Sequence, residues 1–237
     1  MSFLRAEWRK LAIANYAIDP DLLKDQVPFG TELDLWEGKC YVSLVAFMFL
    51  NTKVMGMKIP FHTNFEEANL RFYVRSKDGD NWKRGVVFIK EIVPRHAISF
   101  VANTFYNENY VTLPMRHSWK KHEDELEISY AWKQQDFWHS FAVKAEAQAQ
   151  DLGVGSEAEF ITEHYWGYAP VNAQKSNEYE VRHPRWEHYK VRSQEIIVDF
   201  GRLYGSRFAI LNDRQPDSVM LAEGSEISVE NKSVLTP

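Results

Sequence analysis

The chain has 237 residues, a length that allows one large domain or two small ones. Its 28 Lys and Arg residues against 33 Asp and Glu residues give a net charge of −5, so nucleic-acid binding has no electrostatic support. The single cysteine, Cys40, excludes an intramolecular disulfide and a cysteine-based structural zinc site.

The first twenty residues carry charges at Arg5, Glu7, Arg9 and Lys10 and contain no apolar core of a signal peptide. No stretch of 18 apolar residues predicts a membrane-spanning helix. We therefore expect a cytoplasmic protein without nucleic-acid or membrane partners.

The N-terminal part of the chain predicts a short helix followed by a hairpin. Asp19 is a suitable N-cap for a helix over residues 19–24, because Pro20 then takes the first helical position. Residues 33–36 and 40–49 read as two strands around a turn. The second of these is almost wholly apolar, which favours a strand buried on both faces.

Residues 65–75 predict a strand whose alternation divides it into two faces. One face carries Ala68, Leu70, Phe72 and Val74, and the other carries Glu67, Asn69, Arg71, Tyr73 and Arg75. Residues 84–93 return as the hairpin partner, after a turn at residues 78–80.

The rest of the chain predicts one longer helix and many strands. The helix begins at Pro94 and has a buried stripe at the required spacing, formed by Ile98, Val101, Ala102 and Phe105. Ser156 begins a second helix as part of a capping box. The further strands are expected over residues 127–132, 137–149, 165–168, 179–181, 187–191, 196–199, 207–211 and 218–223.

Ten or more strands with a few short helices predict a β-rich (α+β) fold, a curled or closed antiparallel β-barrel. No linker or internal repeat divides it, so we expect a single domain over residues 1–237.

Other motifs are better explained without a cofactor or a metal. Residues 153–158 match G-x-G-x-x-A, but no buried parallel strand precedes them, and a turn into a capped helix accounts for the pattern. The histidine spacings do not match a metal-ligand motif. Lys120 and Lys121 lie in a run of six polar residues, where their amines would stay hydrated and protonated.

The polar face of the strand over residues 65–75 has two interpretations. It can be a solvated sheet surface, or the inner wall of a barrel that holds a small ligand. In the second case Glu91 on the partner strand joins it, and Arg71 can hold a carboxylate by two parallel hydrogen bonds. Periodicity alone does not decide between them.

Several segments in this order resemble one family, the YqjF-like uncharacterised proteins (domain of unknown function 2071), over roughly residues 3–229. They are residues 15–20, 38–45, 65–74, 84–88, 106–110 with 114–115, and 160–166 with 183–186. That family is grouped with the acetoacetate decarboxylase-like superfamily. The resemblance implies a small-molecule cavity inside a curled antiparallel barrel.

The same resemblance places non-reactive residues where the decarboxylase has its lysine. Met115 matches the Schiff-base lysine and Arg116 its charged neighbour, and a thioether cannot form an imine. The decarboxylase's glutamate matches Glu67 in preference to Glu66. His164 stands where arginine is expected in many relatives.

We expect a barrel that binds a small carboxylate- or carbonyl-bearing metabolite, with Glu67 as a general acid and base. The expected binding residues are Asn69, Arg71, Glu91, Met115, Arg116, His117 and Glu163. Two alternatives stay open: a decarboxylase or lyase that uses another lysine, and a non-catalytic interaction module, including a homodimer formed through an exposed sheet edge.

Overall fold

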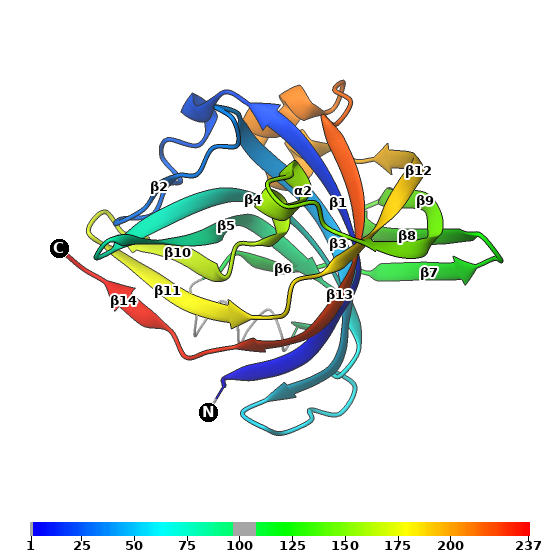
Figure 1. Cartoon of the computed structure of the whole chain (residues 1–237), viewed down its shortest axis with the longest axis horizontal. Helices are drawn as coiled ribbons and strands as arrows, with labels where there is room; N and C mark the ends of the chain where they lie inside the picture. The colour runs from blue at the N-terminus through cyan, green and yellow to red at the C-terminus, as the bar shows by residue number, and fades with distance from the viewer. Residues whose placement is uncertain (1, 97–107) are drawn as a thin grey trace.

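Fourteen strands form one continuous sheet in the computed structural model, which describes residues 2–96 and 108–237 (Figure 1). The strands are β1 (Leu4–Ile18), β2 (Glu32–Leu33), β3 (Cys40–Val54), β4 (Phe65–Asp78), β5 (Asn81–Val93), β6 (Tyr110–Thr112), β7 (Met115–Lys121), β8 (Glu125–Gln134), β9 (Phe137–Asp151), β10 (Trp166–Asn172), β11 (Lys175–Arg182), β12 (Glu187–Ile197), β13 (Ser218–Val229) and β14 (Ser233–Leu235). The short helices are η1 (Pro20–Leu22), α2 (Glu157–Thr162), α3 (Phe200–Tyr204) and η2 (Ser206–Leu211). The stripe of the helix expected after Pro94 lies on residues 97–107, outside the described residues.

Seven of the strands close into a barrel in the order β13-β1-β3-β4-β5-β10-β11. The ring is completed where β11 pairs with β13, through Val181 opposite Val229 and Arg182 opposite Ser228. Neighbouring strands are antiparallel except at the short ladder between β10 and β5. The expected β-rich barrel is therefore confirmed, and closure removes the exposed edges that an open sheet would leave.

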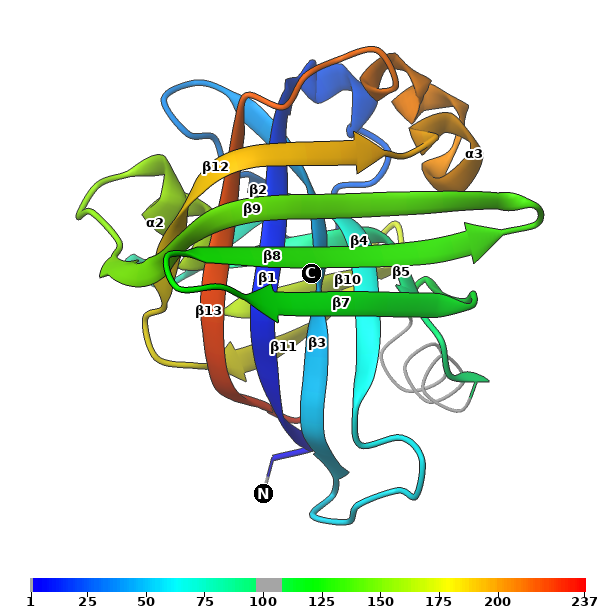
Figure 2. The ribbon, with the colours of Figure 1, turned by 90° about the vertical axis from the view of Figure 1, so that its right-hand side faces the viewer.

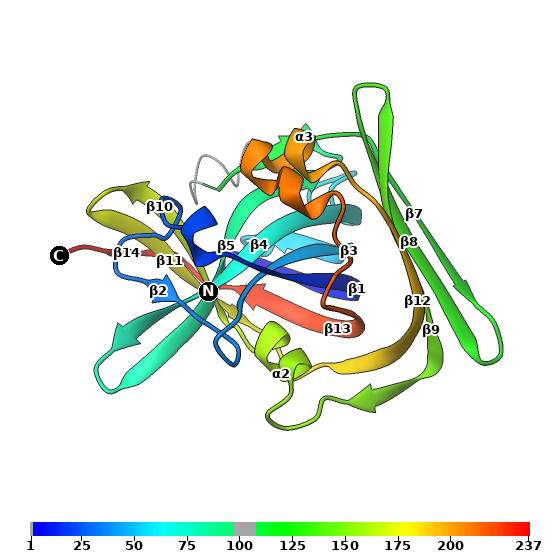
Figure 3. The same cartoon turned by 90° about the horizontal axis from the view of Figure 1, so that it is seen from above.

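The strands β12, β9, β8 and β7 continue from β13 as an outer layer that crosses the barrel strands (Figures 2 and 3). The larger apolar core includes side chains of the barrel and of this layer. It contains Leu70 and Phe72 of β4 together with Trp132 of β8 and Phe141 of β9. One face of β4 therefore packs against the outer layer.

A second apolar core fills part of the barrel. Ile13 of β1, Val45 and Phe47 of β3 and Tyr73 of β4 belong to it. Residues 40–49 of β3 are all buried, as their apolar sequence predicts, because one face meets each core.

Both predicted helix caps are confirmed. The side chain of Asp19 accepts a hydrogen bond from the amide of Asp21 at 3.0 Å, and that of Ser156 accepts one from the amide of Glu159 at 3.2 Å. These caps satisfy amides that have no partner in the first turn of a helix.

Several elements differ from the sequence-based expectation. The hairpin expected between residues 33–36 and 40–49 is wrong, because β2 ends at Leu33 and pairs with β4, which leaves a single bridge between Trp36 and Lys39. The short strands β6 and β14 were not expected.

No strand was expected over Leu4–Ile18, where charged residues interrupt the apolar pattern. This segment is the strand β1, which lies in the barrel wall between β13 and β3. The strand expected over residues 207–211 is wrong, because this segment is the 3₁₀ helix η2. The buried residues there, Phe208 and Leu211, are three positions apart, which suits a helical turn.

The close approach of β13 to β1 depends on a glycine in β13. Gly224 has φ +79°, and a Cβ atom there would lie 2.0 Å from the carbonyl oxygen of Trp8. We expect Gly224→Ala to lower the free energy of unfolding by on the order of 3 kcal/mol, measured by urea unfolding. Gly79→Ala is the control, because Gly79 has φ +60° but open space around it, so an equal loss would show that only the backbone angle matters.

Candidate functional site

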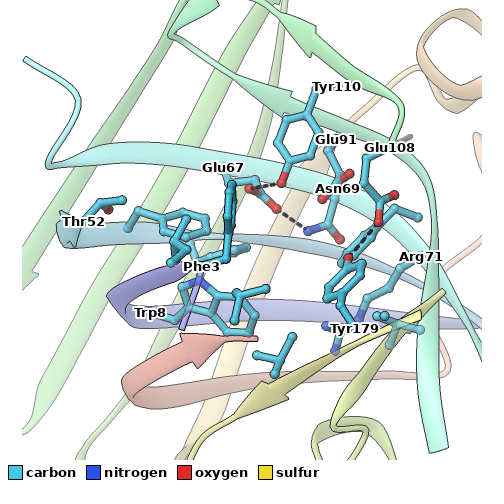
Figure 4. A pocket seen from close by; sticks show the side chains of 18 of the residues that line it. Phe3, Trp8, Thr52, Glu67, Asn69, Arg71, Glu91, Glu108, Tyr110 and Tyr179 are labelled. Carbon is cyan, nitrogen blue, oxygen red and sulfur yellow. Dashed lines mark hydrogen bonds between the residues drawn. The ribbon is translucent and has the colours of Figure 1, made fainter. Parts of the chain in front are cut away.

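A cavity of about 170 Å³ lies inside the barrel, between strands β4, β5 and β11 and the start of β1 (Figure 4). Most of its lining is apolar, with aromatic side chains such as Trp8 and Phe47. The size resembles that of engineered cavities of about 150 Å³ that bind benzene, so it suits a compact ligand. Most of its charged side chains are gathered in one region, whereas Thr52 lies away from them (Figure 4).

Strand β4 supplies three of these polar side chains. Glu67, Asn69 and Arg71 alternate along the strand, so the pleat turns all three to the same face, and all three line the cavity. Their exposed fractions are 2%, 1% and 8%. The polar face of the strand is therefore the inner wall rather than a solvated surface.

Glu67 is held by donors at both carboxyl oxygens. The Asn69 amide donates to Oε1 at 2.9 Å and the Tyr110 hydroxyl donates to Oε2 at 3.3 Å (Figure 4). Burial raises the pKa of Glu67 to about 7, although these hydrogen bonds and the charge of Arg71 act in the opposite direction. A carboxyl group with such a pKa can both give and take a proton near neutral pH.

Two further carboxyl groups lie in the same region, Glu91 from β5 and Glu108 from the segment before β6. The Tyr179 hydroxyl of β11 donates to Glu108 at 2.7 Å. Burial raises the pKa of Glu108 to about 8, and burial together with the charges of Glu108 and Glu67 raises the pKa of Glu91 well above its ordinary value. Glu108 is therefore mostly protonated at neutral pH and able to donate a hydrogen bond to a ligand, and the burial of Glu91 favours its neutral form as well.

Glu108, Tyr110 and Tyr179 were not among the expected site residues. Tyr110 belongs to a strand of only three residues, and Glu108 precedes it, so no periodic pattern marks their direction. Tyr179 did fall in a predicted strand, but its face could not be known without the barrel closure.

Six polar atoms of residues that line the cavity have no hydrogen-bond partner in the described part of the chain, and three of them belong to the polar region around Glu67. These three are Nε of Arg71, Oδ1 of Asn69 and Oε2 of Glu91. The Arg71 guanidinium is fixed from another side, since Nη2 donates to the carbonyl of Ile161 at 3.2 Å. Buried polar atoms are rarely left unpaired, so the wall is suited to a polar ligand or to ordered water.

Four expected site residues lie outside the cavity, and we correct the expected set accordingly. Met115 packs against the larger core, and Arg116 stacks over Trp138 at 4.2 Å. His117 pairs with Glu66 at 2.7 Å, and Glu163 accepts a hydrogen bond from Tyr165. The physical reason for the first three is that β7 pairs with β8 at the edge of the outer layer, away from the barrel interior.

No lysine lines the cavity within residues 2–96 and 108–237, and the sequence of residues 97–107 contains none. Lys120 and Lys121 are exposed at the end of β7. The described residues include no group of three or more side chains arranged to hold a metal ion. Among these same residues, no helix has the length and apolar character needed to span a membrane.

The closed barrel has an acetoacetate decarboxylase-like fold. The crystal structure of acetoacetate decarboxylase from Legionella pneumophila superposes with a TM-score of 0.66 at 14% identity, covering 98% of this chain and 87% of that one. The enduracididine biosynthesis enzyme MppR, in its complex with pyruvate, gives 0.66 at 9% identity, covering 100% and 91%.

Within this fold, the chain belongs to the DUF2071 family of uncharacterized conserved proteins, whose pattern it matches over residues 5–226. It is also 29% identical over 114 residues to the uncharacterized protein YqjF of Bacillus subtilis, which covers 48% of this chain and 46% of that protein. The match thus spans about half the length of this curated relative. The resemblance noted from the sequence is confirmed.

Proposed function

We propose that the barrel cavity binds a small metabolite that carries a carboxylate, and that Arg71 anchors this group. The observation that carries the proposal is a buried guanidinium whose Nε has no partner among the described residues, in a wall shared with carboxyl groups of raised pKa. A guanidinium suits this role because it stays charged when buried and has paired donors for the two carboxylate oxygens.

The protonated acids complete the site for a carbonyl or hydroxyl oxygen. Glu91 and Glu108 offer O–H donors to an oxygen next to the carboxylate, where negative charge develops if a neighbouring proton is removed. Glu67 is the general acid and base that takes this proton and returns it. MppR, which shares the fold, has been crystallised with pyruvate, a carboxylate beside a carbonyl, and this supports the choice of probe.

The test is exchange of the methyl protons of pyruvate with deuterated water, followed by NMR. We expect the full chain to accelerate the exchange and Glu67→Gln to reduce it by at least about a hundredfold, the usual contribution of a general base. Glu66→Gln is the matched control, because Glu66 is the neighbouring residue but pairs with His117 on the other face of β4. If Glu67→Gln exchanged the protons as fast as the unmodified chain, Glu67 would not be the general base.

A separate experiment addresses the decarboxylase alternative that uses a lysine. We expect borohydride reduction in the presence of acetoacetate to leave the intact mass unchanged, because no lysine reaches the cavity wall. A stable adduct on one lysine would show that the cavity has a second form with an amine inside it.

A further inference from the structure

A second polar constellation lies at the wall of the cavity, next to Arg71. His164 follows α2 and lines the cavity, and its Nε2 lies 3.1 Å from Oδ2 of Asp34. The same Asp34 oxygen accepts a hydrogen bond from Nε of Arg84 at 2.7 Å. The Asp34 amide donates to the carbonyl of Tyr73 at 3.0 Å, so the backbone of Asp34 is held against strand β4.

The imidazole of His164 is held rigidly. Its ring lies 4.7 Å from the ring of Tyr73 and 5.0 Å from that of Phe160, and only 1% of the side chain is exposed. Its second nitrogen, Nδ1, makes no hydrogen bond to any residue of the described ranges. A fixed ring with one satisfied nitrogen and one unsatisfied nitrogen is what a ligand-binding histidine requires.

The partners of the ring determine which nitrogen carries the proton. Burial raises the pKa of Asp34, but the hydrogen bonds from His164 and Arg84 outweigh it and hold that pKa below its ordinary value. Burial lowers the pKa of His164 to about 4, so the imidazole is neutral. Because an ionised Asp34 can only accept, the single proton belongs on Nε2, and Nδ1 is a hydrogen-bond acceptor.

Arg71 and His164 both line the cavity and share a neighbour, Tyr73. The Arg71 guanidinium lies 5.6 Å from the ring centre of Tyr73, which the His164 ring also contacts. Arg71 also reaches the carbonyl of Ile161, three residues before His164. The charge of Arg71 acts on His164, so the two side chains belong to the same part of the cavity wall.

We propose that His164 binds the ligand by accepting a hydrogen bond from a hydroxyl or N–H group adjacent to the carboxylate held by Arg71, with Asp34 as its positioning residue. The inference rests on the proposed anion site and specifies its ligand class. A hydroxyl can donate to His164 and accept from the protonated acids, whereas a keto oxygen can only accept. The preferred ligands are 2-hydroxy acids rather than 2-oxo acids.

The first experiment needs no ligand. We expect ¹⁵N NMR of the full chain at neutral pH to show His164 as a neutral imidazole protonated at Nε2, with the resonances assigned by their loss in His164→Phe. Protonation at Nδ1, or an imidazolium, would overturn the proposal because Nδ1 could then not accept a hydrogen bond.

The second experiment compares lactate, as each enantiomer, with pyruvate by calorimetry. We expect one enantiomer of lactate to bind about threefold to tenfold more tightly than pyruvate, the usual effect of one hydrogen bond, and His164→Phe to abolish this preference. His139→Phe is the matched control, because His139 is fully buried but stacks on Trp132 in the other core.

The outcomes separate the two proposals. One outcome is that lactate and pyruvate bind with equal affinity and that Arg71→Met loses the binding of both. This outcome would overturn the role of His164 and leave the anion site intact. Binding of neither acid to the unmodified chain would overturn the proposed function, and the ligand class with it.

Discussion

Replacement of Arg71 by methionine is expected to abolish most of the affinity of the chain for small carboxylates. Arg71 is the only arginine among the described residues that line the cavity, so nothing there can substitute for its charge. Hydrogen bonds to a charged group contribute about 2 kcal/mol, which corresponds to a loss of roughly thirtyfold in affinity. Calorimetry with pyruvate and lactate measures this change.

The stability of the same variant distinguishes lost binding from lost structure. A buried charge without a carboxylate partner carries a desolvation penalty, which an apolar side chain of similar volume avoids. We therefore expect the melting temperature of Arg71→Met to be unchanged or higher.

Arg75→Met is the matched control on the same strand, because Arg75 pairs with Glu32 and stacks over Trp82 outside the cavity. Full carboxylate affinity in Arg71→Met, or an equal loss in Arg75→Met, would contradict the anion site.

The contribution of Glu67 and Glu108 to the free energy of unfolding is expected to fall as the pH rises from about 5 to 8. The folded chain holds Glu67 with a pKa of about 7 and Glu108 with one of about 8, both above the ordinary value of 4.5. At a pH below 4.5 the two carboxyl groups are protonated in the folded and in the unfolded chain, and the stability is not reduced by their ionisation. Above that pH the unfolded chain ionises first, and stability is lost until the folded groups ionise as well. Glu67 alone contributes on the order of 3 kcal/mol to this decline.

Substitution of these acids by glutamine should flatten the pH dependence. Glutamine keeps a neutral polar group of the same shape at every pH. Compared with the unmodified chain, Glu67→Gln and Glu108→Gln are therefore each expected to raise the free energy of unfolding more at pH 8 than at pH 5. Urea unfolding at both pH values measures the difference. The exposed Glu123→Gln should leave the slope unchanged. Glu91 keeps part of the slope in the double variant, so a double variant with the same slope as the unmodified chain would contradict the raised pKa values of Glu67 and Glu108.

The strand over residues 65–75 shows how far the sequence could predict the site. Its alternation correctly grouped Glu67, Asn69 and Arg71, because the pleat of a strand is a local property. The choice of face is not local. It depends on the outer layer, which buries Leu70 and Phe72 and leaves the polar set for the interior of the barrel.

Residues brought to the cavity by irregular segments could not be predicted in the same way. Glu108 and His164 lie outside regular strands, and their direction follows from barrel closure and from the packing of α2. The resemblance to the decarboxylase predicted Met115 and Arg116 at the cavity, but both belong to β7, which pairs with β8 in the outer layer.

The ladders that join neighbouring strands of the barrel differ in length. Within the described residues, the ladder between β10 and β5 contains only Trp166 and Gly167, and the ladder between β11 and β13 contains only Val181 and Arg182, while the short strand β14 pairs with the other edge of β11. The neighbouring strands β1 and β13 pair from Leu4 to Asn15. Since Tyr179 of the hairpin of β10 and β11 faces the buried acids, outward swinging of the hairpin would uncover the interior without unfolding the rest of the wall. Its backbone amides should therefore exchange with solvent deuterium sooner than those of β1, and the frequency of that opening would limit how fast a metabolite arrives.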